Sequence, residues 1–376
     1  MRILLALILF VLVLLLAAPR IVDGAANRTL RRPPYPAPHW ARALVQDSVD
    51  LHADPLLWGR DLLRRGTRGH VDLPRLQEAG AALQVFGVVT QAPLGMNLRR
   101  NSGAADMVTA LAVSSFWPPR TWSSRLQRAL FEADRLRGFE EKSGGKLVPI
   151  RSRAELKALL AARGGRVGTM LALEGSQALE GDLRNVDVLY DAGFRMMAPA
   201  HFVDTDVSGS AHGLQKGGLS DLGRAWVRKL EEKKIIIDLA HASPQAVEEV
   251  LAIASRPLVV SHTGVKGTCD NLRNLSDAQL RALARNGALV GIGYWESATC
   301  GRDAAAVARA MRHAADVIGV GHLALGSDFD GAVAEPFDVT GLPLLAESLR
   351  AEHFSDPDIR SIVSENALKF LLAQLP

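Results

Sequence analysis

The stretch IIIDLAHASPQAVEEVLAIASRPLVVSHT, residues 235–263, decides the fold of this 376-residue chain. It opens with an apolar run, Ile235 to Leu239, and closes with a second one, Leu258 to Val260, and both are typical of buried β-strands. Between them, Ser243 and Pro244 are typical of the N-cap and first turn of a helix. A strand, a helix and a strand in such close succession indicate two parallel strands joined by a crossover helix.

The same alternation extends in both directions from this stretch. Ser276 and Gly287, for example, bound a helix over residues 277–286. The long interval Thr90 to Arg166 is predicted to be an excursion over the barrel with at least two helices, Thr121 to Lys142 and Arg153 to Ala162. The strands are expected at Val45 to Leu51, Leu83 to Val89, Val167 to Leu173, Phe194 to Pro199, Ile235 to Leu239, Leu258 to Val260, Ala288 to Gly293 and Leu323 to Gly326. Eight such strands predict an α/β fold, a (β/α)₈ TIM barrel, over residues 45–376.

Composition agrees with one large domain. The chain is 48% hydrophobic, which is enough to bury a sizeable core. Its 44 basic and 40 acidic residues leave a net charge of only +4, spread along the chain. A nucleic-acid-binding protein would carry a clustered basic surface, so no nucleic-acid partner is expected.

The N-terminus is a separate unit in this interpretation. An almost unbroken apolar run from Ile3 to Ala18 predicts a signal peptide or an N-terminal membrane anchor within residues 1–26, and a buried N-terminal helix is the alternative. Gly24-Ala25-Ala26 offers small residues for cleavage but lies some way beyond the run, which leaves cleavage open. Residues 27–44, rich in proline, are predicted to be an extended linker. We therefore expect export, to the periplasm or to a membrane-anchored position facing the periplasm or exterior, with attachment through residues 3–18 as an option.

Ionisable side chains stand at the ends of six of the predicted strands. The C-terminal strand ends of a TIM barrel converge on one mouth, where such enzymes carry out their chemistry. His52 and Asp54, two residues apart in an extended segment, point to the same face. The residues that we expect at this mouth are His52, Asp54, Glu174, His201, His241, His262 and Asp328.

Each of these residues has an ordinary structural explanation when taken alone. A histidine that closes an apolar strand is often only a buried histidine, and Asp328 and Asp330 fit a turn. Unrelated structural residues, however, have no reason to gather at the same end of several strands. Imidazole and carboxylate are the ligands that zinc accepts, and there are more of them than one tetrahedral ion needs. The set therefore predicts two metal ions bridged by Glu174 and a hydroxide.

The two cysteines, Cys269 and Cys300, remain ambiguous at this level. An exported protein can oxidise such a pair, but the sequence does not show that the two residues meet. Two unpaired core thiols are the alternative.

Seven short motifs, in this order, resemble those of the membrane (renal) dipeptidases and their bacterial relatives. The resemblance runs from about Asp47 to Leu371, and the stretch from Phe202 to Ser210 is more similar to the bacterial branch. The ordered set is specific although each motif alone is modest. The motifs are His-Ala-Asp at 52–54, Leu-Glu-Gly at 173–175, Asp-Leu-Ala-His at 238–241, Ser-His-Thr at 261–263, Leu-Arg-Asn-Leu at 272–275, Gly-Ser-Asp-Phe-Asp-Gly at 326–331 and Glu-Asn-Ala-Leu at 365–368.

This resemblance implies a ligand set for two Zn²⁺ ions per chain. His52 and Asp54 resemble the ligands of the first zinc, and His241 and His262 those of the second. Glu174 resembles the carboxylate that bridges the two.

The resemblance also implies roles around the metals. His201 matches the histidine that steadies the substrate carbonyl, and Arg273 the arginine that binds the C-terminal carboxylate of the substrate. Asp328 matches the acid/base at the last strand. Cys269 and Cys300 match a disulfide of the animal members, which favours the bonded interpretation.

The expected activity is zinc-dependent hydrolysis of small dipeptides by a metal-bridging hydroxide, with Asp328 and His201 as the catalytic side chains and His201, Arg273 and Asp328 in contact with the substrate. A homodimer is compatible with this expectation. One alternative is another binuclear amidohydrolase, such as a lactonase, a deaminase or a phosphotriesterase-like enzyme. Many of those use a lysine on the fourth strand, and Phe194 to His201 contains none. A catalytically silent metal-binding protein is the other alternative.

Overall fold

The computed structural model of the chain describes residues 17–376. Nearly all of the apolar run that we interpret as a signal peptide or anchor lies outside the described residues. Residues 17–26 are helical. No helix within residues 17–376 combines the length and the apolar character needed to cross a bilayer.

Eight parallel strands form the sheet in the order β6-β5-β4-β2-β1-β9-β8-β7. A short additional strand, β3 (Leu147–Pro149), pairs with the first half of β4, and β5 pairs with the second half. The eight strands are β1 (Val49–Ala53), β2 (Leu83–Val89), β4 (Val167–Glu174), β5 (Phe194–Met197), β6 (Ile236–Ile237), β7 (Val259–Thr263), β8 (Leu289–Ile292) and β9 (Leu323–Leu325). A bridge between Asp238 and Val259 joins the two outer strands of this order, β6 and β7. The sheet is thereby closed, and the fold is the expected (β/α)₈ barrel.

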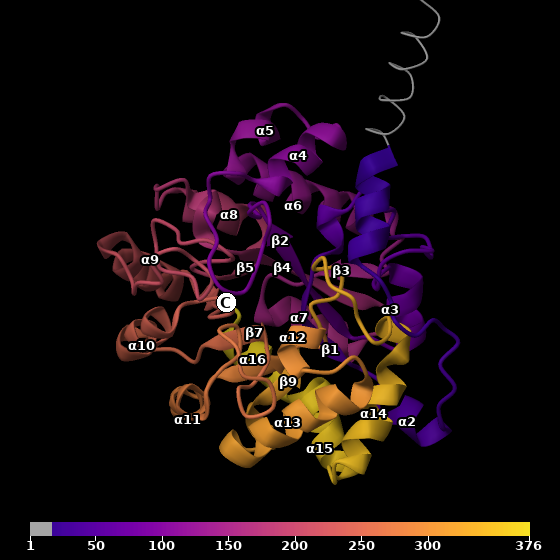
Figure 1. Cartoon of the computed structure of the whole chain (residues 1–376). Coiled ribbons are helices and arrows are strands. Elements are labelled where there is room, and N and C mark those ends of the chain that lie inside the picture. Colours follow the sequence, from indigo (N-terminus) through magenta and orange to yellow (C-terminus); the bar gives the residue numbers. More distant parts are fainter. Residues whose placement is uncertain (1–16) are drawn as a thin grey trace, which may run out of the picture.

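Helices surround the sheet (Figure 1). Their ends follow the local signals in the sequence: the Ser243 side chain accepts a hydrogen bond from the Ala246 N–H, and Gly287 ends its helix at a φ of 82°. The helices are α2 (His39–Leu44), α3 (Leu73–Ala79), α4 (Met107–Ser114), α5 (Arg120–Ser123), α6 (Arg125–Lys142), α7 (Arg153–Ala161), α8 (Asn185–Ala192), α9 (Asp221–Glu232), α10 (Pro244–Ile253), α11 (Asp277–Asn286), α12 (Glu296–Thr299), α13 (Ala304–Ile318), α14 (Leu342–Ala351), α15 (Asp356–Arg360) and α16 (Asn366–Gln374).

The barrel interior is a packed core. Inward side chains such as Leu51, Val85, Met170 and Val259 are fully buried in one cluster. Phe370 of α16 belongs to the same cluster, so this helix covers one end of the interior. The other end is open to the site described below.

Two expectations differ from the structure near the N-terminus. The first strand begins at Val49 rather than Val45, because Val45 ends α2 and Asp47 turns the chain at a φ of 61°. Residues 27–44, expected as an extended linker, lie against the barrel and include α2. Tyr35 is only 4% exposed because its ring packs on Phe337.

The joint between β6 and β7 depends on one buried carboxylate. Asp238 Oδ1 accepts hydrogen bonds from the Ala240 N–H (3.0 Å) and the Ser261 N–H (2.9 Å), and Oδ2 accepts one from the Ser261 hydroxyl (2.5 Å). β6 is only two residues long, so the Asp238 carboxylate supplements a short ladder at the joint.

We expect Asp238→Ala to lower the urea midpoint of unfolding, because it leaves buried N–H groups without acceptors at about 1–3 kcal/mol each. Asp270→Ala is the control, since the Asp270 side chain is 80% exposed and its loss should change stability by less than about 0.5 kcal/mol. Equal midpoints for the two variants would contradict a structural role for Asp238.

Candidate metal centre

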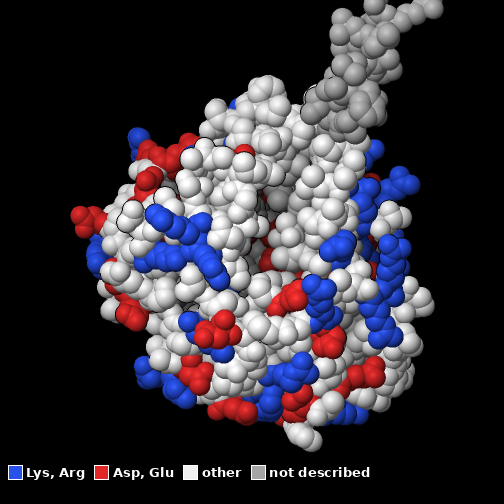
Figure 2. All heavy atoms as spheres, in the orientation of Figure 1, with Lys and Arg blue, Asp and Glu red and all other residues white. Residues whose placement is uncertain are grey.

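The carboxyl ends of the strands surround a hollow in the molecular surface, visible near the centre of Figure 2. All seven side chains that the sequence placed at the barrel mouth meet there. Each is at most 9% exposed. They are His52 on β1, Asp54 directly after it, Glu174 at the end of β4, His201 after β5, His241 after β6, His262 on β7 and Asp328 after β9.

Glu174 lies at the centre of this group. Its Oε2 atom is 3.6 Å from His52 Nε2. Its other oxygen, Oε1, is 3.1 Å from His241 Nε2 and 3.3 Å from His262 Nε2. One carboxylate therefore presents a different oxygen to each of two histidine sets, which is the arrangement of a group that bridges two cations.

His241 and His262 form the first of these sets. Their Nε2 atoms are 3.0 Å apart and face each other. Burial holds the pKa of both histidines well below the usual value, so both imidazoles are neutral at pH 7. Two neutral imidazoles whose nitrogens face Glu174 make a donor set that fits a divalent cation.

His52 and Asp54 form the second set. His52 Nε2 lies 3.4 Å from Asp54 Oδ1, and neither atom has a hydrogen-bond partner among the described residues. Burial opposes a charge on His52, but the Asp54 and Glu174 carboxylates outweigh it and raise the pKa of His52 well above its usual value. The position thus favours a positive charge, which fits a metal ion.

Gly87 on β2 keeps this second set open. A Cβ atom at Gly87 would lie 2.1 Å from Asp54 Oδ1 and 3.0 Å from His52 Nε2. Any larger residue would therefore displace the two side chains.

A relay of hydrogen bonds orients His262. The Ser261 hydroxyl donates to Asp238, so its oxygen accepts from His262 Nδ1, 2.9 Å away. With the proton on Nδ1, the Nε2 lone pair points at Glu174, as a metal ligand requires. This relay joins the closure of the barrel to the site.

Irregularities in two strands aim the histidines inward. The register of β1 shifts between Asp50 and Ala53, and that of β7 shifts between Val260 and Thr263. Asp50 faces the layer between the sheet and the helices, where it accepts hydrogen bonds from Ser327 and Gln84. Strict alternation would put His52 on the same outer side as Asp50, and the shift turns it into the mouth instead.

Asp328 and Asp330 have different environments. Asp328 lines the cavity with Oδ1 4.0 Å from His52 Nε2, and burial together with the Asp54 and Glu174 charges raises its pKa well above the usual value. Asp330 is fully buried away from the cavity, where it pairs with Arg60 (3.0 Å) and accepts from the His70 N–H. Asp330 thus lies in a turn, as the sequence allows, but its carboxylate is also the buried ion-pair partner of Arg60.

Arg273 enters the cavity from the loop after β7. Nη2 donates to the His262 carbonyl at 2.6 Å, and the guanidinium lies over the Trp295 ring at 5.5 Å. Burial lowers its pKa to about 10, so it stays charged at neutral pH. Because only Nη2 donates to a described protein group, the other guanidinium nitrogens are available to an anion in the cavity.

The remaining sequence-predicted residues are also near the centre. His201 Nε2 is 3.5 Å from Glu174 Oε1, and Nδ1 is 3.4 Å from the Gln91 carbonyl. Cys269 and Cys300 form a disulfide. It ties the loop that carries Arg273 to the segment after β8 that carries Trp295.

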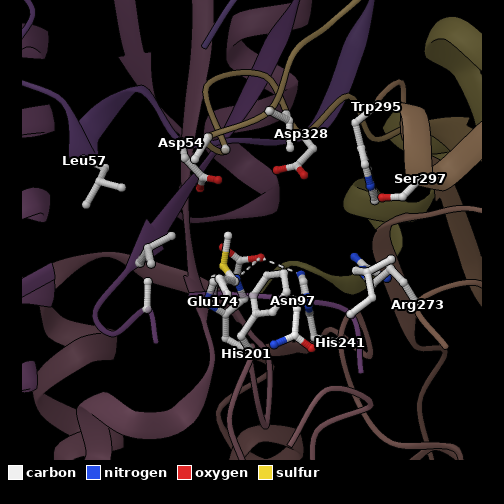
Figure 3. Close-up of a pocket in the computed structure, with 18 residues that line it drawn as sticks. Asp54, Leu57, Asn97, Glu174, His201, His241, Arg273, Trp295, Ser297 and Asp328 are labelled. Carbon is white, nitrogen blue, oxygen red and sulfur yellow. Dashed lines mark ion pairs between the residues drawn. The ribbon is translucent and has the colours of Figure 1, made fainter. Parts of the chain in front are cut away.

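The cavity has a volume of about 230 Å³. This is smaller than the roughly 300–1,000 Å³ of pockets for drug-sized ligands and fits a small one. In Figure 3 the carboxylates of Asp54 and Asp328 point toward the space above Glu174 and His241, with Arg273 and Trp295 to one side and Leu57 to the other. The carboxylates of Asp54, Asp328 and Glu174 thus make one part of the cavity anionic, and the guanidinium of Arg273 makes one wall cationic.

Several pocket residues were missed by the sequence analysis. Met96 and Asn97 come from the long excursion after β2, and Trp295 follows β8. Burial lowers the pKa of His212 to about 3, and its Nδ1–H donates to the Leu98 carbonyl at 2.9 Å, which ties this excursion to the loop after β5. None of these residues has a local sequence signal, because only tertiary contacts bring them to the mouth.

Residues 23–29, which follow the apolar run, contact the loop that lines one side of the cavity. The Ala332 N–H, in the loop that lines the cavity, donates to Asn27 Oδ1 at 2.9 Å. Thr29 forms a bridge with Glu335 in the same loop. Asp23, 3% exposed, pairs with Arg60, which also pairs with Asp330. Residues that the sequence assigned to the leader and linker therefore hold one wall of the cavity.

Comparisons with known proteins show similarity over most of the chain. A family model described as membrane dipeptidase (peptidase family M19) matches residues 41–374. A metallopeptidase from Rhodobacter sphaeroides, solved with a phosphinate mimic of the dipeptide L-Ala-D-Ala, is 25% identical with a TM-score of 0.71, over 88% of this chain and 99% of that one. A probable dipeptidase from Pseudomonas aeruginosa is 18% identical with a TM-score of 0.74, over 89% and 97% of the two chains, and shows the same fold. An uncharacterised protein of Klebsiella pneumoniae is 31% identical over 245 residues, 61% of this chain and 89% of its own length.

We expect Gly87→Ala to reduce metal content strongly, because the added methyl group occupies the space between Asp54 and His52. Gly138→Ala is the matched control, since no atom lies within 4 Å of a Cβ at this position in α6 and alanine favours the helix. Metal analysis of both purified proteins, with circular dichroism to verify folding, measures the effect. A folded Gly87→Ala protein with the metal content of the control would contradict the assignment of His52 and Asp54 as ligands.

Proposed function

Because this chain belongs to the membrane dipeptidase family and is a metal-dependent dipeptidase, we propose that it hydrolyses small dipeptides with two zinc ions per chain. The observation that carries the proposal is Glu174, whose two oxygens face two separate sets of ligands. His52 and Asp54 would hold one ion, and His241 and His262 the other. When bound, zinc polarises the peptide carbonyl and lowers the pKa of a bridging water, so that a hydroxide is available near neutral pH.

Arg273 would orient the substrate. Its planar fork suits a bidentate contact with the C-terminal carboxylate of a peptide. The Trp295 ring and the His262 carbonyl hold the guanidinium in place beside the ligand histidines. With the carboxylate anchored there, the small cavity leaves room for only one residue beyond the scissile bond, which favours dipeptides over longer chains.

His201 would stabilise the negative charge that develops on the carbonyl oxygen. The Gln91 carbonyl can only accept a hydrogen bond, so the His201 proton at rest belongs on Nδ1. Nε2, 3.5 Å from Glu174 Oε1, then donates to the substrate only when both ring nitrogens carry a proton.

Asp328 would move the proton. Its carboxylate lines the cavity and faces the same space as Glu174, so it can take a proton from the attacking water. The same group then donates this proton to the leaving amine.

We further propose that the protein is exported and faces an oxidising compartment, attached to the membrane through residues 3–18. The apolar run and the Cys269–Cys300 disulfide support this location, because disulfides persist mainly outside the cytosol.

A panel of dipeptides, assayed with the purified protein before and after chelation, tests the proposed function. We expect about two equivalents of zinc per chain, loss of hydrolysis with a chelator and recovery when zinc is added back. Glu174→Ala should lower the content below two, since both sets of ligands lose the shared carboxylate. A protein with two equivalents and no dipeptide hydrolysis would instead be the silent metal-binding alternative.

We expect Asp328→Asn to keep its metal but to lose about a hundred-fold or more in kcat, the usual scale for a general acid/base. Asp330→Asn should behave differently, because it removes an anionic partner of the buried Arg60 and lowers stability by roughly 1–3 kcal/mol. Turnover, zinc content and the urea midpoint, measured on both variants, separate the two effects. Loss of zinc in Asp328→Asn would mean that Asp328 is a ligand rather than a proton carrier.

Amidation of the C-terminus of a dipeptide tests the role of Arg273. A charge-assisted contact is worth roughly 1.5–3 kcal/mol, so the wild-type protein should prefer the free carboxylate by about ten- to a hundred-fold in kcat/KM. Arg273→Ala should cleave the free and amidated forms almost equally, and Arg273→Lys should recover part of the preference because an ammonium lacks the fork. A strong preference that persists in Arg273→Ala would point to another anchor.

A further inference from the structure

Exposed apolar side chains gather on one face of the protein. Within residues 17–376, thirteen large hydrophobic side chains are exposed, and single ones are normal on any protein surface. Six of the thirteen, however, come from the N-terminal helix and from the short region of α4 and α5. They are Ile21, Val22, Met107, Val113, Phe116 and Trp122, and we call the surface that they form the apolar face.

The two parts of the apolar face are adjacent. Ala26 of the N-terminal helix packs against the same small cluster as Leu111 and Ala112 of α4. A surface depression is lined by Pro19 and Arg20 from the helix and by Phe116 from the end of α4. Figure 1 shows α4, α5 and the N-terminal helix together at the top of the molecule.

Charge is sparse on the part of this face that α4 and α5 form. Residues 104–124 contain only two charged side chains, Asp106 and Arg120. Asp106 pairs with the buried Arg128 and does not contribute a free negative charge to the surface. In Figure 2 the top of the molecule is correspondingly almost free of blue and red atoms, in contrast to its lower half.

The apolar segment that precedes the N-terminal helix indicates what covers this face. The described chain starts there with residue 17, near the end of the uncharged apolar run from Ile3 to Ala18. A run of this kind partitions into lipid. Tryptophan is enriched where membrane proteins meet the headgroup region, and here Trp122 is 40% exposed and Phe116 is 73% exposed.

We propose that the apolar face lies on the surface of a lipid bilayer, with Phe116 and Trp122 in the interfacial layer. The inference rests on the proposed attachment through residues 3–18 and adds a defined orientation to it. The hollow of the active site opens toward the viewer in Figure 2, whereas the apolar face points upward. The mouth of the cavity therefore stays open to water, from which dipeptides arrive.

The orientation can be measured on the full-length protein bound to vesicles of equal parts phosphatidylcholine and phosphatidylglycerol. Because the native cysteines are joined to each other, a thiol introduced by Val113→Cys or Phe116→Cys takes an environment-sensitive fluorophore. Ile253→Cys on α10 is the matched control: Ile253 is 39% exposed and Val113 43%, but α10 lies away from the apolar face. We expect blue-shifted emission and quenching by brominated lipid acyl chains at positions 113 and 116, and neither effect at 253.

Flotation of the vesicles with the protein reports the attachment separately from the orientation. Protein that floats with the vesicles while position 113 is no more quenched than position 253 would overturn the orientation and leave the attachment standing. Protein that fails to float would overturn both. A fluorophore at 116 that is shielded without vesicles, together with a cross-linked dimer, would show that a second copy covers the face and would also overturn the proposal. Dipeptide hydrolysis should be unaffected by the label at any of these positions, and this verifies that the labelled proteins are folded.

Discussion

A buried carboxylate that several histidines share is the constraint on which the rest of this structure depends. Glu174 is 4% exposed, and although burial opposes its charge, His201 and His52 hold its pKa well below the usual value. An ionised carboxylate in such a place costs several kcal/mol unless it is paired. The surrounding imidazoles, and the cations that they would hold, supply that pairing. The strand ends must therefore bring their side chains close enough to Glu174 to share a cation with it.

The barrel meets this demand through a second layer of carboxylates behind the ligands. Asp238 closes the joint between β6 and β7 and, through Ser261, orients His262. Asp50 similarly joins β1 to the segment after β9 through Ser327, just before Asp328. The same hydrogen bonds thus stabilise the fold and position the side chains of the site. Together these two effects offset the desolvation cost of burying the two carboxylates.

The walls of the cavity depend on segments far from the strands. The disulfide and the Trp295 ring hold the loop of Arg273, and Asn27 holds the loop of Ala332. Asp330 joins this loop to Arg60, and Arg60 in turn pairs with Asp23 in the N-terminal helix. If the helix is the point of attachment to a membrane, the attachment and one wall of the active site are consecutive parts of one network of contacts.

The sequence by itself determined the barrel and the set of ionisable residues that meet at its mouth. Strand periodicity, caps such as Ser243 and the histidines at strand ends are local signals, and parallel strands must bring their ends to one mouth. Only the tertiary structure decided the rest. The shift in β1 that turns His52 inward, the burial of Asp330 and the role of Asn27 arise from contacts between different segments of the chain, and the last two join residues hundreds of positions apart. No local pattern encodes such contacts, because a bulge or a loop position is set by what packs against it and not by its own residues.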